Sequence, residues 1–241
     1  MTVLPIALHI PDGFLSAGVA AVAAVLAALA VGIALRVSDR ELDEARIPML
    51  GVLAAFIFAA QMLNFPVAGG TSGHFLGATL AAALLGPWLA CLVLTVVVGV
   101  QAFAFADGGI TALGANVLNM GVLGALLAGL VLGAIVRTLA PGKGAFLASV
   151  GGVAWLAVML GAAATSIELA ISETVPLATV LPAMLGVHAL IGLGEAAITV
   201  AAVAAVLALR PDLVAFGIWE PTSQVPVAPE PGSTATARGA S

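Results

Sequence analysis

Residues 183–209 read AMLGVHALIGLGEAAITVAAVAAVLAL, a long apolar stretch with just two ionisable side chains, His188 and Glu195. A helix needs about 20 mostly apolar residues to cross a bilayer, so this stretch predicts a membrane-spanning helix. The rest of the chain has the same character, because 62% of its 241 residues are hydrophobic and 8% are charged. Water-soluble domains carry roughly 25% charged residues. A bilayer is therefore the predicted surrounding for most of the chain.

Further apolar stretches occupy most of the sequence before residue 183. They are residues 14–36, 47–64, 75–86, 88–106, 115–138 and 145–170. Within a bilayer, only helices and closed barrels satisfy all backbone hydrogen bonds, and these stretches do not alternate in polarity as barrel strands do. We therefore predict an all-α, polytopic membrane protein of about seven transmembrane helices. The stretch 75–86 is short and ends at the turn signal Gly86-Pro87, so six helices are the alternative if residues 75–106 form one broken unit.

The cationic side chains predict the orientation of these helices. They are Arg36, Arg40, Arg46, Arg137, Lys143, Arg210 and Arg238. Seven helices would place all of them on one side of the membrane, whereas six would split them across both sides. Because cytoplasmic loops are enriched in Lys and Arg, we predict an N-terminus outside and a cytoplasmic C-terminus. The predicted location is the cell membrane (inner or plasma membrane), crossed several times.

The sequence also argues against several functions. It has no basic patch for nucleic acid. Its single cysteine, Cys91, allows neither an internal disulfide nor a cysteine-based metal cluster. A phosphate-binding loop of the form G-x-x-x-x-G-K-[ST] is missing, because Gly142-Lys143 lacks the upstream glycine and the following Ser or Thr. We therefore expect no nucleic-acid partner, no ATP hydrolysis by this chain itself and no enzymatic activity.

The chain has three histidines, His9, His74 and His188, and the predicted topology places all of them at or near the outer face. His9 and His74 lie in non-helical segments rich in turn residues. A neutral imidazole is a common metal ligand, although a single histidine is usually structural. Position alone therefore leaves metal binding and a structural role as equal alternatives.

Motifs around these histidines carry a resemblance to a known family. In chain order they are HIPDGFLS at 9–16, QMLNFP at 61–66, GGTSGHFLG at 69–77, DGGITALGANVLN at 107–119, GVHALIGLGEAAIT at 186–199 and Arg210-Pro211-Asp212. Together they resemble the CbiM/NikM family, the cobalt- and nickel-binding (S) subunits of energy-coupling factor transporters. The resemblance covers about residues 9–213, nearly the whole membrane domain.

The resemblance implies that the chain captures Co(II) or Ni(II) at the outer face for ATP-driven import. In this family the metal is held by four nitrogens in a plane: the terminal amine, the next backbone amide and two histidine side chains, which map onto His9 and His74. Square-planar nitrogen sites suit Ni(II) or Cu(II), and Co(II) can be accommodated. The metal would be the transported ion, so we expect no resident cofactor. Between the two ions we favour cobalt, for cobalamin synthesis.

The resemblance also implies partners: a transmembrane coupling (T) subunit and two ATP-binding cassette ATPases, often with a small accessory membrane subunit. The alternative function is a self-contained secondary metal-ion transporter or channel, which needs a path of ionisable residues inside the membrane. Only Glu195, and Glu168 near a helix end, fit that requirement. An intramembrane hydrolase built from Cys91, His188 or Glu195 lacks any supporting nucleophile-base motif.

The resemblance divides the chain into an extension at 1–8, a transmembrane metal-binding domain at 9–213 and a tail at 214–241. From about Glu220 the tail is rich in Pro, Ser, Thr, Ala and Gly, which predicts a disordered cytoplasmic segment. The extension departs from the family, in which the first histidine directly follows the initiator methionine. Either translation starts seven codons later, at Leu8, or the ligand set differs. Our hypothesis is the later start, since leucine codons include bacterial start codons.

The remaining polar residues of the motifs receive supporting roles. Asp12 is expected to cap the first helix or to help order the loops around the histidines. Hydrogen bonds that order the loops and orient the histidines are expected from Asn64, Thr71, Ser72, Asp107, Asn116 and Asn119. His188 and Glu195 share a helix face about 10 Å apart along its axis. A buried, satisfied helix–helix contact is the first interpretation for both, and a role in metal passage is the second.

Overall fold

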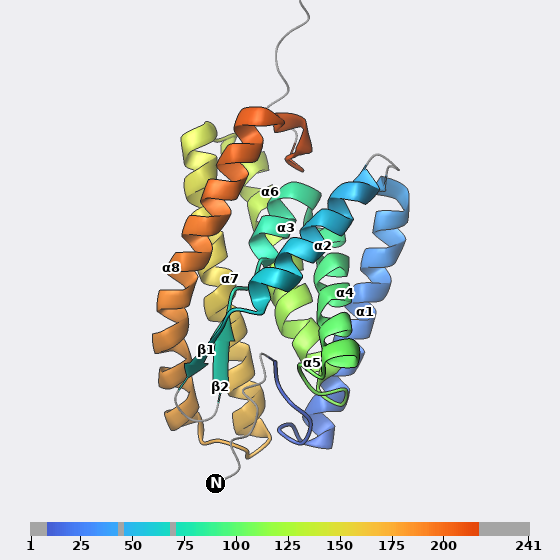
Figure 1. The fold of residues 1–241 in the computed structure, drawn as a ribbon, viewed down its shortest axis with the longest axis vertical. Coiled ribbons are helices and arrows are strands. Elements are labelled where there is room, and N and C mark those ends of the chain that lie inside the picture. The colour runs from blue at the N-terminus through green and yellow to red at the C-terminus, as the bar shows by residue number, and fades with distance from the viewer. Residues whose placement is uncertain (1–8, 43–45, 68–70, 217–241) are drawn as a thin grey trace, which may run out of the picture.

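The computed structural model of this chain describes residues 9–42, 46–67 and 71–216, with the backbone alone at 41, 64–67, 71 and 72. The described part is a bundle of helices with one small β-hairpin (Figure 1). The α-helices are α1 Ala17–Glu41, α2 Ile47–Gln61, α3 Ala78–Leu85, α4 Pro87–Phe105, α5 Leu113–Val117, α6 Leu127–Leu139, α7 Lys143–Ile171 and α8 Leu177–Leu209. The other elements are strands β1 Asn64–Val67 and β2 Thr71–His74, the π-helix η2 Leu118–Leu126 and the 3₁₀ turn η3 Pro211–Leu213. The predicted all-α class is confirmed, with the hairpin as an addition.

Five helical stretches of the described residues are long and apolar enough to cross a membrane. They are Ala17–Arg40, Pro87–Phe105, Leu113–Leu139, Lys143–Ile171 and Leu177–Leu209. The third is built from α5, η2 and α6 in continuous succession. These stretches make the chain a multi-pass membrane protein, as the sequence predicts.

Helices α2 and α3 differ from the long helices. They contain 15 and 8 residues, which at 1.5 Å per residue gives lengths of about 22 and 12 Å, whereas the hydrocarbon core is about 30 Å thick. Neither is long enough to cross alone. The stretches predicted at 47–64 and 75–86 are therefore helical but short, and the count of seven crossings stays a prediction.

The hairpin joins α2 to α3. Its antiparallel register pairs Asn64 with His74 and Val67 with Thr71, so the strands satisfy part of each other's backbone. Both strands contact α8, and every residue of α3 is buried. Non-helical backbone in a membrane protein is tolerated where other parts of the protein cover it, and α8 packs against both strands.

Most cationic residues of the described part lie at or next to helix ends. Arg40 is in the last turn of α1 and Arg137 in the last turn of α6. Lys143 begins α7, and Arg210 follows α8. In Figure 1 these helix ends all point toward the upper end of the bundle, and α1 begins at the lower end. This arrangement agrees with the predicted common side, and its assignment to the cytoplasm stays a prediction.

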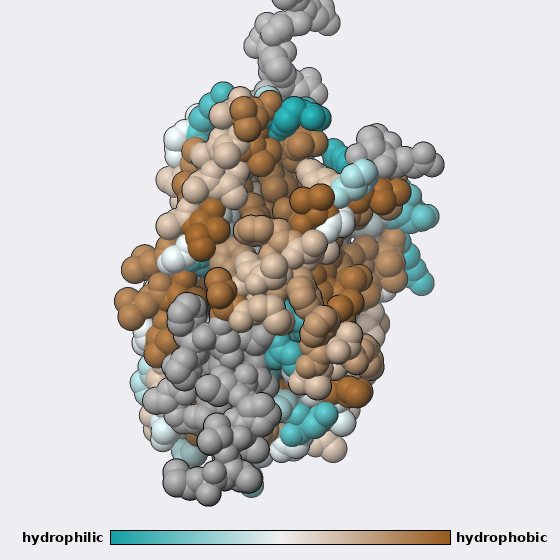
Figure 2. All heavy atoms as spheres, viewed as in Figure 1, coloured by the Kyte–Doolittle hydropathy of each residue, from teal (hydrophilic) through white to brown (hydrophobic). Residues whose placement is uncertain are grey.

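The outer surface is apolar, as expected for side chains that face lipid. Leu190, Leu193 and Phe103 have relative exposures of 71%, 61% and 67%. Hydrophobic side chains cover the middle of the face in Figure 2, and most of the hydrophilic surface lies toward the two ends. Helix α1 contributes strongly to this surface, since Val22, Leu26 and Leu29 are all exposed.

Candidate metal centre

Two of the three histidines meet inside the bundle. His9 belongs to the segment before α1, and His74 ends β2. Their ring centroids are 4.9 Å apart, with the rings edge to face at 89°. His9 is buried and His74 is partly buried. The structure therefore brings together the two side chains that the sequence singled out, at a separation that allows nitrogens of both rings to reach one ion.

His9 is held by a chain of amide side chains. Its Nε2 atom lies 2.8 Å from Oε1 of Gln101 on α4. The Gln101 Nε2 atom donates to Oε1 of Gln61 on α2 at 3.0 Å, and the Gln61 Nε2 atom donates to the Leu76 carbonyl at 2.8 Å. Both glutamines are fully buried. No role was predicted for these two amides, although an amide within an apolar helix does indicate a buried partner.

The segment that follows His74 is fixed from several sides. The His74 Nδ1 atom lies 2.7 Å from the Phe75 carbonyl, which can only accept, so Nδ1 carries the proton and Nε2 is free to bind. The backbone N–H groups of Leu76 and Gly77 donate to the carboxylate of Glu195, at 2.7 and 2.8 Å. Glu195 is 2% exposed. The carboxylate therefore contacts the non-helical backbone between β2 and α3, whereas our first interpretation was a contact between two helices.

His188 lies on α8 next to the hairpin. Its Nδ1 atom donates to the Met184 carbonyl at 2.8 Å. Its Cε1 and Nε2 atoms face Gly73, where an added Cβ atom would stand 3.2 Å from each and would also collide with Ile191. The third imidazole therefore packs against the residue that precedes His74. Gly73 has no side chain because none fits there.

The segment that carries His9 is attached to the connection between α4 and η2. Asn116 binds both backbone groups of Ile10: its Oδ1 atom accepts from the Ile10 N–H at 3.0 Å, and its Nδ2 atom donates to the carbonyl at 3.1 Å. The Gly109 N–H also donates to the Ile10 carbonyl, at 2.9 Å. Gly108 adopts a φ of +95°, and a Cβ there would stand 2.9 Å from Cβ of His9. The predicted loop-ordering position of Asn116 is thus adjacent to the histidine.

Asp12 also holds this segment, but not as a helix cap. Its Oδ1 atom accepts from the backbone N–H of Thr111 at 2.7 Å and from the Thr111 hydroxyl at 2.5 Å. The cap of α1 is Ser16, whose side chain accepts from the Val19 N–H at 3.4 Å. The predicted capping role of Asp12 is therefore wrong, because the chain turns at 13–16 before the helix begins. Further along, the Thr174 hydroxyl donates to the Phe14 carbonyl.

The other predicted supporting residues are more dispersed. Asn119 on η2 donates to Glu168 at 2.8 Å and to Thr165 at 3.2 Å, both on α7 and neither of them a histidine. The charge of Asp107 reaches His74, where it favours the protonated ring. Three further predicted residues, Asn64, Thr71 and Ser72, have side chains that lie outside the described part.

The local environment keeps both imidazoles neutral. Burial lowers the pKa of His9 to about 4, with partial compensation from the hydrogen bond to Gln101. Burial also lowers the pKa of His74 to about 3, assisted by the nearby His9 and opposed by Phe75 and Asp107. A histidine must be unprotonated to bind a metal ion. Both rings are therefore ready to bind at neutral pH.

The two imidazoles would supply only part of a coordination shell. Among the described residues, no three or more His, Cys, Asp or Glu side chains gather where they could hold an ion. Two imidazole nitrogens are donors of the kind that suits nickel, copper or cobalt rather than magnesium or calcium.

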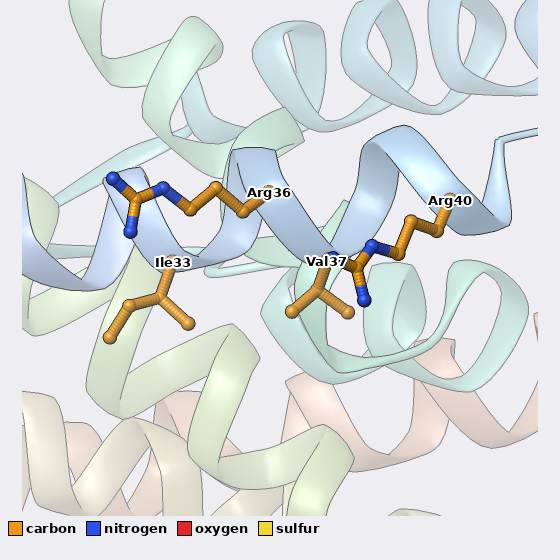
Figure 3. Close-up of a pocket in the computed structure, with 4 residues that line it drawn as sticks. All are labelled: Ile33, Arg36, Val37 and Arg40. Atoms are coloured by element: carbon orange, nitrogen blue, oxygen red, sulfur yellow. The ribbon is translucent and has the colours of Figure 1, made fainter.

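A separate hollow of about 440 Å³ lies on α1 and is lined by Ile33, Arg36, Val37 and Arg40. Figure 3 shows the two arginine side chains extending along the surface of the helix. Two guanidinium groups are permanently positive and repel a metal cation. The hollow is therefore not the metal centre.

The fold and the site define a multi-pass membrane protein with a paired-histidine centre at the interior end of its hairpin. Residues 9–213 match the family model CbiM, the cobalt uptake substrate-specific transmembrane region. The chain belongs to this family, which is a membrane metal-transport family and not an enzyme family.

Individual relatives support this assignment. The chain is 43% identical over 209 residues to a protein of Haloquadratum walsbyi named for metal transport, covering 86% of this chain and 93% of that protein. It is 33% identical over 237 residues to the fused nickel transport protein NikMN of Rhodobacter capsulatus, covering 92% and 67% respectively. A crystal structure of a truncated transition metal transporter matches with a TM-score of 0.75 and 33% identity, covering 83% of this chain and 98% of that one.

Proposed function

We propose that this chain is the substrate-capture subunit of an ATP-driven energy-coupling factor transporter that imports Co(II) or Ni(II). His9 and His74 would bind the ion at the outer face. The observation that carries the proposal is the 4.9 Å approach of two imidazoles from segments 65 positions apart in the sequence. The transported ion is the substrate, so no resident cofactor is part of the proposal.

The two rings suit this task chemically. Each keeps one nitrogen engaged in a hydrogen bond, to Gln101 for His9 and to Phe75 for His74. Such outer partners fix ring orientation in metal sites. Since the rings come from two different segments, a bound ion would join the N-terminal segment to the hairpin.

The remaining donors are proposed to come from the start of the chain, as the family resemblance implies. Residues 1–8 lie outside the described residues. If translation begins at position 8, a terminal amine and an amide nitrogen would be adjacent to His9. The intact mass of the purified protein decides between the two starts. An intact extension of residues 1–7 together with full metal affinity would contradict the later start.

Energy for import is proposed to come from partner subunits. The sequence has no phosphate-binding loop, and some relatives carry names of fused transporter components. A transmembrane coupling subunit and two ATPases, with a small accessory membrane subunit, would complete the transporter. Metal uptake in cells that lack every such ATPase would contradict this part and would favour a secondary transporter, while leaving metal capture intact.

The direct test is a metal titration of the purified, metal-stripped protein in detergent. We expect Ni(II) or Co(II) to bind with about one ion per chain. His9→Ala and His74→Ala should each reduce the affinity to the background level. Arg40→Ala, at the other end of the bundle, is the matched control and should bind like the wild type. Unchanged binding in both histidine variants would overturn the proposal.

A further inference from the structure

The buried amides of Gln101 and Gln61 form a directed chain of hydrogen bonds that ends at His9. We infer that Gln101 is a positioning residue that holds His9 as the tautomer protonated on Nε2, which leaves Nδ1 free for the metal. Gln61 sets the orientation of Gln101. The inference rests on the proposed role of His9 as a ligand, but the tautomer itself is a property of the metal-free protein.

The donor-to-acceptor direction of this chain of hydrogen bonds is set at the peptide group between Leu76 and Gly77. In a trans peptide, the C=O and N–H groups point in opposite directions. The Gly77 N–H donates to Glu195 on α8, so the Leu76 carbonyl points the other way, toward Gln61 on α2. The Glu195 carboxylate therefore fixes the orientation of the Leu76 carbonyl, the acceptor at which the chain of hydrogen bonds begins.

Each following bond has one allowed sense. A carbonyl oxygen only accepts, so the atom of Gln61 that lies 2.8 Å from the Leu76 oxygen must be the amide nitrogen. The Gln61 oxygen then faces Gln101, which must present its own nitrogen at 3.0 Å. The Gln101 oxygen is left for His9, and the ring nitrogen at 2.8 Å must carry a proton.

The burial of these side chains makes the opposite donor-to-acceptor direction unfavourable. Gln61 and Gln101 are fully buried, and His9 is 6% exposed. Reversing any link would place two acceptors or two donors in contact without water to separate them, which is costly in an apolar interior. A neutral imidazole has one N–H and one bare nitrogen. With Nε2 protonated, the bare nitrogen is Nδ1, the ring nitrogen closer to the main chain.

The chain of hydrogen bonds also connects the two segments that carry His9 and His74. The peptide that begins the chain lies in the segment that follows His74, and the chain ends at His9. It passes through side chains of α2 and α4 and is anchored by α8. A displacement of the hairpin would therefore act on the His9 ring through hydrogen bonds as well as through direct contact.

The experiment uses the full-length, metal-free protein labelled with ¹⁵N-histidine. Nitrogen–proton NMR spectra distinguish the two tautomers, and the three histidines are assigned with single-histidine variants. We expect His9 to show a protonated Nε2 and a bare Nδ1 in the wild type. Protonation at Nδ1 in the wild type would overturn the inference, whether or not any variant folds.

Two substitutions at position 101 separate positioning from packing. Gln101→Leu keeps the volume but removes the acceptor, so the single Nε2-protonated signature should be lost and Ni(II) affinity should fall about 10- to 100-fold, as for other outer partners of metal-bound histidines. Gln101→Glu still accepts from His9, and when protonated it can donate to Gln61. It should therefore keep the signature and most of the affinity. A packing role predicts the reverse order, with Leu tolerated and Glu harmful.

Gln61→Leu provides a test that leaves the direct partner of His9 in place. Gln101 is then free to turn, so the tautomer signature should weaken without loss of the residue that touches the ring. If Gln61→Leu and Gln101→Leu both retain the wild-type tautomer and affinity, the inference fails. A wild-type protein with the expected tautomer but no metal binding would instead contradict the proposed function alone.

Discussion

The two segments that carry His9 and His74 are held in place by different means. The N-terminal segment is tied to the short helix α5 through Asn116 and to the loop before that helix through Thr111. The hairpin segment is tied to the interior of long helices, through Gln61 on α2 and Glu195 on α8. In both cases side chains bind the backbone of an irregular segment and so satisfy groups that regular structure would otherwise pair.

The difference lies in exposure. Asp12 and Thr111 form an exposed contact, whereas Asn116, Glu195 and Gln61 are buried. A hydrogen bond lost at the surface is replaced by water, but a buried group left without a partner costs about 1–3 kcal/mol. The hairpin anchors should therefore matter most for stability, and the outer anchor of the N-terminal segment least.

Glu195→Ala should have the largest effect on this comparison. It leaves the buried N–H groups of Leu76 and Gly77 without an acceptor, at about 1–3 kcal/mol each. Thermal unfolding in detergent should show a clear loss of stability, and Ni(II) binding should weaken because the segment after His74 is released. Glu195→Gln keeps one acceptor oxygen and should be intermediate. Wild-type stability in the alanine variant would contradict the proposed anchoring.

Gly73→Ala should come next, through overpacking. Its Cβ would collide with Ile191 and press on His188, and such crowding costs about 1–3 kcal/mol. We expect a lower melting temperature and weaker metal binding, since His74 is the next residue. Gly152→Ala on α7, where a Cβ meets nothing within 4 Å, is the control and should be at least as stable as the wild type.

Asn116→Ala should have a moderate effect on the N-terminal segment. The Ile10 N–H loses its acceptor, at about 1–3 kcal/mol, while the Ile10 carbonyl keeps the bond from Gly109. Asn116→Asp retains an acceptor for the N–H and should recover part of the loss. Metal titration of both variants measures how far the position of His9 depends on this clamp. Equal affinity in Asn116→Ala and the wild type would show that it does not.

Asp12→Ala should have the smallest effect, and its dependence on pH provides the check. Hydrogen bonds from Thr111 hold the pKa of Asp12 below its ordinary value, which is about 3.9. The stabilisation of the folded protein by the Asp12 carboxylate is therefore fully present above the ordinary pKa. It is lost as the pH falls through the lower pKa that Asp12 has in the folded state. The difference in melting temperature between wild type and variant should be constant from pH 7 to about pH 5. A difference that vanishes already near pH 6 would contradict it.

The sequence predicted a great deal of this molecule. Its hydrophobic stretches located the helices, because lipid exposure requires apolar side chains along the whole length of each helix. The histidines were noticed because ionisable residues are rare in such a chain. The hairpin was missed, since 64–74 is a turn-rich connection without a strand pattern. The cap of α1 was wrongly assigned to Asp12. Asp and Ser are both favourable capping residues, so residue type alone does not distinguish Asp12 from Ser16.

The sequence by itself determined that this chain is a helical bundle in a membrane, and it indicated His9 and His74 as the candidate metal ligands. Hydrophobicity is a sum over neighbouring residues, so it can be read along the chain. Only the tertiary structure decided that His9 bonds to Gln101, 92 residues away, and that Glu195 holds the segment after His74. Hydrogen bonds need atoms about 3 Å apart in a defined direction, and that geometry exists only once the helices have packed.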